Sequence, residues 1–303
     1  MIGWLLEGDI AIKFQTYRDL LGVEDKERQK KILKRGWGKQ FLSYRYPDGH
    51  WGQRFYQPKW TSSHYTLIDL RNLCPDRNHS PIRNSITKIA REEKGIDGGI
   101  NPSRGIANSD VCVNGMFLNY ACYFNVDSKL LESLVDFILS QKMLDGGFNC
   151  RSNRTGARHS SLHTTLSITE GIAEYRRQGY SYRLKELETA EKESIEFMLL
   201  HQLFISDRTG KVIHKDFLRF AYPRRWRYDI LSALDYFQHA GIKWDSRLQM
   251  AMDTLMRKRN KDGTWNLNAK HPGQTHFDME TAGKPSRWNT LRALRVLQHF
   301  GLQ

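Results

Sequence analysis

The chain has 303 residues, of which 39% are hydrophobic and 26% are charged, and its formal net charge is +14. This composition is ordinary for a soluble globular protein, and no apolar run approaches the roughly 20 residues that a membrane helix needs, which excludes a membrane span. The start, MIGWLLEGDI, has no basic region and only a short apolar stretch, so we expect no secretory signal and a cytoplasmic protein.

The first predicted helix covers residues 8–22, with Asp9 as its N-cap. An Asp-Gly turn then recurs along the chain, at 48–52, 97–101, 145–149 and 262–266, with a degenerate copy at 206–210. The steps between the aspartates are 49, 48, 62 and 55 residues, which fits two helices and their connections. Asp bonds its own backbone and Gly adopts positive φ, so the pair favours a tight turn.

Helices are predicted on both sides of these turns. Amphipathic helices precede three of the turns, at 38–47, 130–143 and 248–260. Less charged, apolar-periodic helices follow the turns, at 60–73, 109–124, 160–175, 226–240 and 287–300. No sustained alternation with period two predicts a strand.

Repetition of this unit predicts an all-α fold in which each hairpin packs on its neighbours. We expect a single domain over residues 1–303, an α/α toroid of about five to six helical hairpins. The less charged helices would form its inner ring and the more charged helices its outer ring. An open α-solenoid would give the same pattern.

The repeat resembles that of prenyltransferases and squalene cyclases. Gln40-Phe41-Leu42 leads into the turn at 48–52, and Leu139-Ser140-Gln141-Lys142 leads into Asp145-Gly146-Gly147-Phe148. The resemblance covers nearly the whole chain and implies the toroid, which hosts terpene cyclases, protein prenyltransferases, lanthionine cyclases and non-enzymatic binding domains. Class II terpene cyclases use Asp-x-Asp-Asp, and this chain has no two adjacent aspartates, so that reaction is not expected.

A zinc site is implied by the similarity to the catalytic subunit of protein prenyltransferases. That family binds zinc with Asp-x-Cys and a later His, matched here by Asp110, Cys112 and His163. Two pocket positions differ, because Ala107 and Val113 replace the family's lysine and tyrosine. Lanthionine cyclases suggest a second pattern of two cysteines and one histidine.

Geometry favours the same group of residues, because every turn should lie at the end where an inner helix begins. The candidate zinc ligands are Asp110, Cys112, Cys150, His159 and His163. His159 and His163 have the i, i+4 spacing of a helical pair, and three protein ligands would leave one zinc position open. With no export signal, metal binding or burial of the four cysteines is favoured over disulfides. The alternative is a packed, hydrogen-bonded cluster without metal, since His64 occupies an equivalent place in an earlier repeat.

A second candidate site is basic and aromatic. The predicted anion-binding residues are Arg104, Arg224, Arg225, Arg227, Lys284, Arg287, Trp226 and Trp288. Arg104 matches the family's diphosphate-binding arginine, and Arg beside Trp suits cation–π contact and phosphate binding. Alternatively, the tryptophans pack between helices and the arginines cover them. Glu170 and Asp229 are the candidate catalytic acid and base, or else pair with arginines.

These features predict a cytoplasmic toroid that uses Zn²⁺ to activate a thiol or water for transfer or cyclisation. The expected partner is a small molecule or peptide in the central funnel, including a phosphorylated one. The alternative function is non-catalytic binding of a peptide or anionic ligand. Nucleic acid is not the expected partner, since no segment has a basic groove interleaved with aromatic residues.

Overall fold

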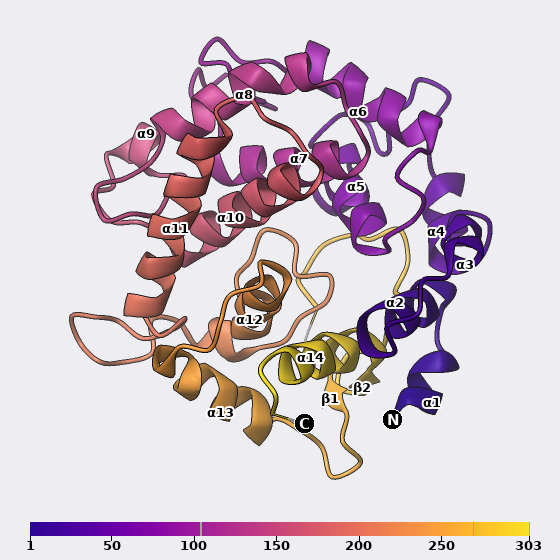
Figure 1. The fold of residues 1–303 in the computed structure, drawn as a ribbon. Helices are drawn as coiled ribbons and strands as arrows, with labels where there is room; N and C mark the ends of the chain where they lie inside the picture. Colours follow the sequence, from indigo (N-terminus) through magenta and orange to yellow (C-terminus); the bar gives the residue numbers. More distant parts are fainter. Residues whose placement is uncertain (104, 269, 303) are drawn as a thin grey trace. The chain divides into compact units, whose positions relative to one another are not determined.

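The computed structural model describes residues 1–103, 105–268 and 270–302, and these residues are mostly helical (Figure 1). The α-helices are α1 (Ile2–Leu6), α2 (Ile10–Leu20), α3 (Lys26–Lys31), α4 (Gly36–Ser43), α5 (Ser63–Asn72), α6 (Ser80–Glu92), α7 (Val111–Tyr123), α8 (Ser128–Ser140), α9 (Ser152–Thr155), α10 (Leu162–Arg177), α11 (Leu184–Leu200), α12 (Ile230–His239), α13 (Gln249–Arg257) and α14 (Arg287–His299). Short 3₁₀ helices are η1 (Lys59–Thr61), η2 (Lys215–Leu218) and η3 (Ser246–Leu248). The prediction of an all-α protein is confirmed.

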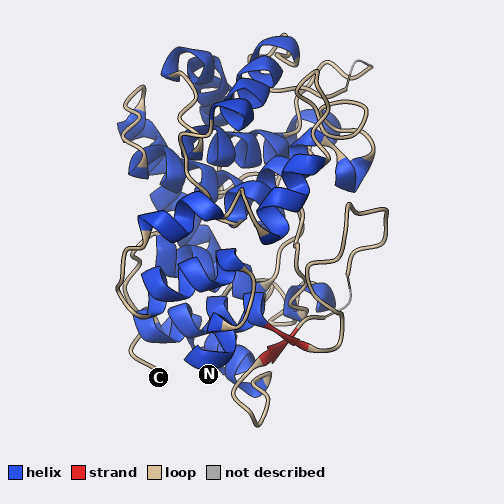
Figure 2. Ribbon diagram, turned by 90° about the vertical axis from the view of Figure 1, so that its right-hand side faces the viewer, coloured by secondary structure: helices blue, strands red, loops and turns tan. Residues whose placement is uncertain are grey.

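Strand structure is confined, within the described residues, to one short antiparallel pair and a few isolated bridges. Strand β1 (Trp265–Asn266) pairs with β2 (Pro285–Ser286), with Trp265 opposite Ser286 (Figure 2). In the same part of the chain, no helix combines the length and the apolar character needed to cross a bilayer.

The chain forms two compact units. The first unit comprises Met1–Tyr44, Asn72–Asp76 and His201–Gln303, and the second comprises Arg45–Arg71 and Arg77–Leu200. The prediction of one domain over residues 1–303 remains a prediction.

Two helical layers make up the second unit. Helices α7 and α10 pack against each other, α8 packs against α7, and α11 packs against α10 (Figure 1). Nearly every residue of α7 is buried, because its sequence is apolar on all sides. Helix α8 instead buries one stripe, which includes Leu131, Leu134, Val135 and Ile138 at helical spacing. Within this unit, α7 is therefore buried on nearly all sides, whereas α8 is buried along one stripe.

The first unit brings the two ends of the chain together. Helix α14 packs against both α12 and α2, α13 packs against α12, and α1, α3 and α4 pack against α2. Arg295 of α14 contacts Asp19 of α2, with 3.0 Å between Nη1 and Oδ2. The first and last long helices of the chain are thus direct neighbours.

The predicted Asp-Gly turns share one geometry. In four of them, the residue two before the Asp donates its N–H to the carbonyl two after it, as in Tyr46 to His50 at 2.8 Å. The four glycines have φ between +85° and +95°, a region that side chains disfavour; they are Gly49, Gly98, Gly146 and Gly263. The degenerate copy closes differently, with Ser206 N–H bonded to the Lys211 carbonyl at 2.8 Å.

Each regular turn is joined to the inner helix that follows it. The residue three after the Asp is fully buried, and its N–H donates to a side chain of that helix. The pairs are Trp51 with Ser63 (2.9 Å), Ile100 with Asn114 (2.6 Å), Phe148 with Thr165 (3.0 Å) and Trp265 with Thr290 (3.0 Å). This bond fixes where the buried side chain lies between the helices.

Three turns are also joined to the next outer helix, through a serine whose hydroxyl donates to the carbonyl of the turn glycine. The pairs are Ser85 with Gly49 (2.6 Å), Ser133 with Gly98 (3.1 Å) and Ser194 with Gly146 (2.9 Å). A turn therefore connects one repeat to the next.

Candidate functional site

Three arginines and two histidines come together in the first unit, in the loops that precede α12 and α14. Arg225 is only 6% exposed and has a φ of +62°. The His271 ring hydrogen-bonds to the backbone of Arg224 and interacts electrostatically with Arg225 and Arg227. His276 interacts in the same way with Arg225. We call Arg224, Arg225, Arg227, His271 and His276 the basic cluster.

Both histidines of the basic cluster are held neutral. Burial lowers the pKa of His271 to about 4, with the charges of Arg227 and Arg225 adding to the effect. Burial and Arg225 likewise lower the pKa of His276 to about 4. The Nε2 atom of His271 is buried and meets no hydrogen-bond partner among the described residues. At neutral pH these rings offer uncharged hydrogen-bonding groups beside the guanidinium charges.

Aromatic side chains pack beside the arginines. Trp288 is 2% exposed and stacks on Tyr222, with centroids 4.7 Å apart, and on Trp37, at 6.1 Å. The guanidinium of Arg227 lies 5.1 Å from the centre of a Trp226 ring. Trp288 therefore packs in the core, which agrees with the alternative in which the tryptophans pack between helices. Trp226, in contrast, makes the expected contact with an arginine.

Two carboxylates accompany the basic cluster. Asp216 Oδ2 lies 3.9 Å from Arg227 Nη1. Asp229 caps α12, since its oxygens accept the Ser232 N–H at 2.8 Å and the Ser232 hydroxyl at 2.9 Å. Burial raises the pKa of Asp229, while the nearby charges of Arg292 and Arg224 oppose that rise. Its contacts are those of a helix cap rather than of a free acid or base.

The remaining predicted anion-binding residues lie elsewhere or are engaged. Arg287 Nε donates to the Trp4 carbonyl at 2.9 Å, its guanidinium covers the Trp4 ring at 4.4 Å, and Nη2 lies 3.7 Å from Glu7. Arg287 thus ties α14 to the N-terminal segment. Lys284 is exposed, and Arg104 lies outside the described residues.

The predicted zinc shell is not assembled. Among the described residues, which include all five candidates, no three His, Cys, Asp or Glu side chains are placed to hold a metal ion. Asp110 is instead paired with Arg154 at 3.2 Å. Helix α10 begins only at Leu162, so His159 is outside it and the expected i, i+4 helical pair with His163 does not form. The carbonyl of His159 accepts the Asn149 amide at 2.7 Å, and that of His163 accepts the Ser167 hydroxyl at 3.1 Å.

Two of the five candidates do meet. The N–H of Cys112 donates to Cys150 Sγ at 3.0 Å, and the Thr164 hydroxyl donates to the same sulfur at 3.5 Å. The two thiols are free, half-buried and hydrogen-bonded to each other. The bond from Cys112 and that from Thr164 lower the pKa of Cys150 against the opposing effect of burial, whereas the bond to Cys150 and burial raise that of Cys112.

An aromatic cluster lies next to this cysteine pair. Burial raises the pKa of Tyr56, with Cys112 and Cys150 adding to the rise, and its hydroxyl is 2.9 Å from that of Tyr65. His64 is fully buried among these rings, with Nδ1 3.2 Å from the Tyr120 hydroxyl. Burial lowers the pKa of His64 to about 3, so the ring is neutral. His64 therefore belongs to the packed core.

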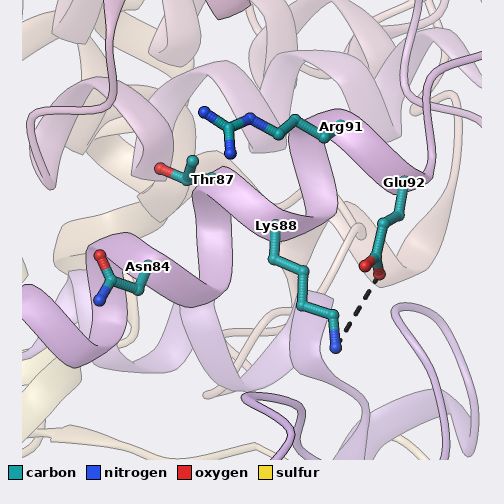
Figure 3. A pocket seen from close by; sticks show the side chains of 5 residues that line it. All are labelled: Asn84, Thr87, Lys88, Arg91 and Glu92. Carbon is teal, nitrogen blue, oxygen red and sulfur yellow. Dashed lines mark ion pairs between the residues drawn. The ribbon is translucent and has the colours of Figure 1, made fainter.

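Two further features contribute little to a site. Glu170 is half-buried on α10, where its carbonyl accepts the Asn119 amide at 2.8 Å. A surface pocket is lined by five residues of α6 alone, namely Asn84, Thr87, Lys88, Arg91 and Glu92 (Figure 3). Its lysine is tied to the Asp48 carbonyl at 2.8 Å and to Glu92 at 4.0 Å. None of the predicted site residues lines this pocket.

No protein-family model matches the chain, and no curated protein matches it at a significant level. The basic cluster and the cysteine pair are therefore the two candidate functional sites of the chain. The sequence analysis did not single out His271, His276 or Thr164 as parts of these sites. The histidines lie in a loop without periodicity, and the only signal was their position shortly before the Arg287-Trp288 motif.

Proposed function

We propose that the chain is an α/α toroid of the prenyltransferase and squalene-cyclase kind that binds a phosphate-bearing ligand at the basic cluster. The observation that carries the proposal is the convergence of Arg224, Arg225 and Arg227 on the neutral rings of His271 and His276. Guanidinium groups bind phosphate through charge-assisted hydrogen bonds, and a neutral imidazole adds a donor without needing a counter-ion.

Support for the toroid comes from the repeat and from the chain ends. Four turns share one backbone geometry and one bond to the following helix, and α14 packs directly on α2. A closed ring needs its first and last repeats in contact, whereas an open solenoid keeps them apart.

Binding is favoured over zinc catalysis because the donor set for zinc is not assembled. A catalytic zinc needs three protein ligands around one ion. Asp110 is engaged by Arg154, and His159 lies outside α10. The arginines of the basic cluster, in contrast, lie together beside the two neutral histidine rings.

The test is a thermal unfolding series with pyrophosphate, compared with sodium chloride at matched ionic strength. At roughly a hundredfold excess over the dissociation constant, binding stabilises the folded chain by about 2.7 kcal/mol. Arg225→Gln is expected to abolish the shift, and Arg227→Gln to weaken it. The matched control is Arg35→Gln, which removes an exposed charge in the same unit and should keep the shift. An equal shift in wild type and Arg225→Gln, or no shift in wild type at millimolar pyrophosphate, overturns the proposal.

A further inference from the structure

The cysteine pair occupies a setting that favours one thiolate. Cys112 is the second residue of α7, a helix of 13 residues, and its N–H points at Cys150 Sγ from 3.0 Å. The first N–H groups of a helix have no partner within the helix and carry partial positive charge. The sulfur of Cys150 therefore accepts a hydrogen bond that stabilises its negative form.

A second element supplies another donor to the same sulfur. Thr164, in the first turn of α10, donates its hydroxyl to Cys150 Sγ at 3.5 Å and accepts the Cys150 N–H at 3.2 Å. The Cys112 thiol adds a third bond to it. Cys150 Sγ thus receives donors from two helices, the Cys112 N–H of α7 and the Thr164 hydroxyl of α10.

From this asymmetry we propose that Cys112 and Cys150 form a dithiol–disulfide couple that exchanges with small-molecule disulfides. Cys150 is the attacking thiolate and Cys112 is the resolving thiol. Such a couple needs one stabilised thiolate in contact with a second thiol, and both must be reachable by the reagent. The two residues are in contact and half-buried.

The reaction is balanced as follows. The Cys150 thiolate attacks one sulfur of a disulfide RSSR, forms a mixed disulfide and releases RS⁻, which takes the proton of the Cys112 thiol. The Cys112 thiolate then attacks Cys150 Sγ, closes the internal disulfide and releases the second RS⁻, which is protonated by solvent. The two cysteines lose two electrons and RSSR gains them, giving two RSH.

Closing this bond would link two repeats. Cys112 begins α7, and Cys150 follows the next turn, 38 residues later. The disulfide would then constrain a loop that contains α8 and the turn at 145–149. We expect the oxidised protein to unfold at a higher temperature than the reduced protein.

The chain offers matched controls for this chemistry. Cys74 and Cys122 are free thiols that are 7% and 0% exposed, so they should react slowly. The first measurement is alkylation of the reduced wild-type protein by iodoacetamide at pH 7, followed by peptide mass spectrometry. Cys150 should react at least about tenfold faster than Cys112, Cys74 and Cys122. Equal rates, or faster reaction of Cys112, overturn the assignment of roles.

The second measurement is intact mass after incubation with oxidised glutathione. Wild type and Cys74→Ser should each lose two hydrogen atoms and give one cross-linked peptide that contains Cys112 and Cys150. Cys112→Ser should instead trap a single glutathione on Cys150, and Thr164→Val should slow the reaction. A wild-type protein that keeps glutathione without forming the cross-link, or that links Cys74 or Cys122, overturns the proposal. The alkylation test needs no substitution, so it stands even where a variant fails to fold.

Discussion

Gly115 of α7 faces Gly171 of α10 at backbone contact distance. A Cβ on Gly115 would lie 2.5 Å from the carbonyl oxygen of Ser167, and one on Gly171 would lie 2.6 Å from that of Gly115. Two inner helices of the second unit therefore approach each other through their main chains.

Gly115→Ala is expected to lower the free energy of unfolding by about 1–3 kcal/mol, because rigid backbone atoms leave no room for the methyl group. Chemical denaturation measures the change. Gly3→Ala is the control, since Gly3 lies in α1 with nothing within 4 Å of the added carbon. Because alanine has a higher helix propensity than glycine, Gly3→Ala should raise the free energy of unfolding by up to about 1 kcal/mol. Equal effects of the two substitutions would contradict the close approach.

Thr165→Val tests the bond between a turn and its inner helix. The substitution keeps the shape of the side chain but removes the hydroxyl that accepts the buried Phe148 N–H at 3.0 Å. An unpaired buried N–H costs about 1–3 kcal/mol of unfolding free energy. Thr189→Val, on the exposed face of α11, should change stability by less than about 0.5 kcal/mol. A Thr165→Val variant with an unchanged free energy of unfolding would show that this hydrogen bond does not contribute to stability.

The buried imidazole of His64 makes stability depend on pH. Its pKa falls from the ordinary 6.5 to about 3 in the folded chain, so the unfolded chain binds more protons between these values. The contribution of His64 to the free energy of unfolding is therefore complete above pH 6.5. It is lost as the pH falls toward 3, by up to about 1.4 kcal/mol per unit of pKa difference.

Urea unfolding between pH 7 and pH 4 should show a shallower pH dependence in His64→Phe than in wild type. His159→Gln removes an exposed imidazole and serves as the control. Equal slopes in His64→Phe and wild type would rule out His64 as the source.

Asp235 of α12 pairs with two arginines of α14, of which Arg292 is buried and Arg295 is half-buried. Its oxygens lie 3.2 Å from Arg292 Nε and 2.5 Å from Arg295 Nε. Burial alone would raise the pKa of Asp235, but Arg295 and Arg292 hold it at about 2. Asp235→Asn should lower the free energy of unfolding by about 3–5 kcal/mol, since the Arg292 guanidinium stays buried without this carboxylate. Asp253→Asn, at an exposed position of α13, should have little effect in the same denaturation assay.

The turns were predictable because their chemistry is local. Asp and Gly in sequence set both the side-chain bond and the positive φ, so the positions at 48–52 and 262–266 needed no tertiary information. The acceptors that anchor the turns were not predictable in the same way. They are Ser63, Asn114, Thr165 and Thr290, which differ in residue type and lie between 12 and 25 residues from their donors.

Zinc binding remains a prediction, but the described residues do not bring its five candidate ligands together, and His159 lies outside α10. The helix starts at Leu162, and Arg154 of the short helix α9 engages Asp110. Arg287 was expected to bind an anion, but it donates to the Trp4 carbonyl. This contact could not be predicted from sequence, because the two residues are 283 positions apart. Cys112, Cys150 and the arginines of the loop before α12 could be named as candidates from sequence because each lies near a predicted helix start.

The serines that bond to the turn glycines bear on how such a chain can grow or shrink. Three of the turns are bonded to a hydroxyl encoded 35 to 48 residues later, as with Ser133 for Gly98 and Ser194 for Gly146. Duplication or deletion in whole steps, from one turn to the next, keeps each of these glycines with its serine. A break between a turn and its serine separates them. The breakpoints that preserve the pairing, in nature or in the laboratory, therefore lie between a serine and the start of the next turn.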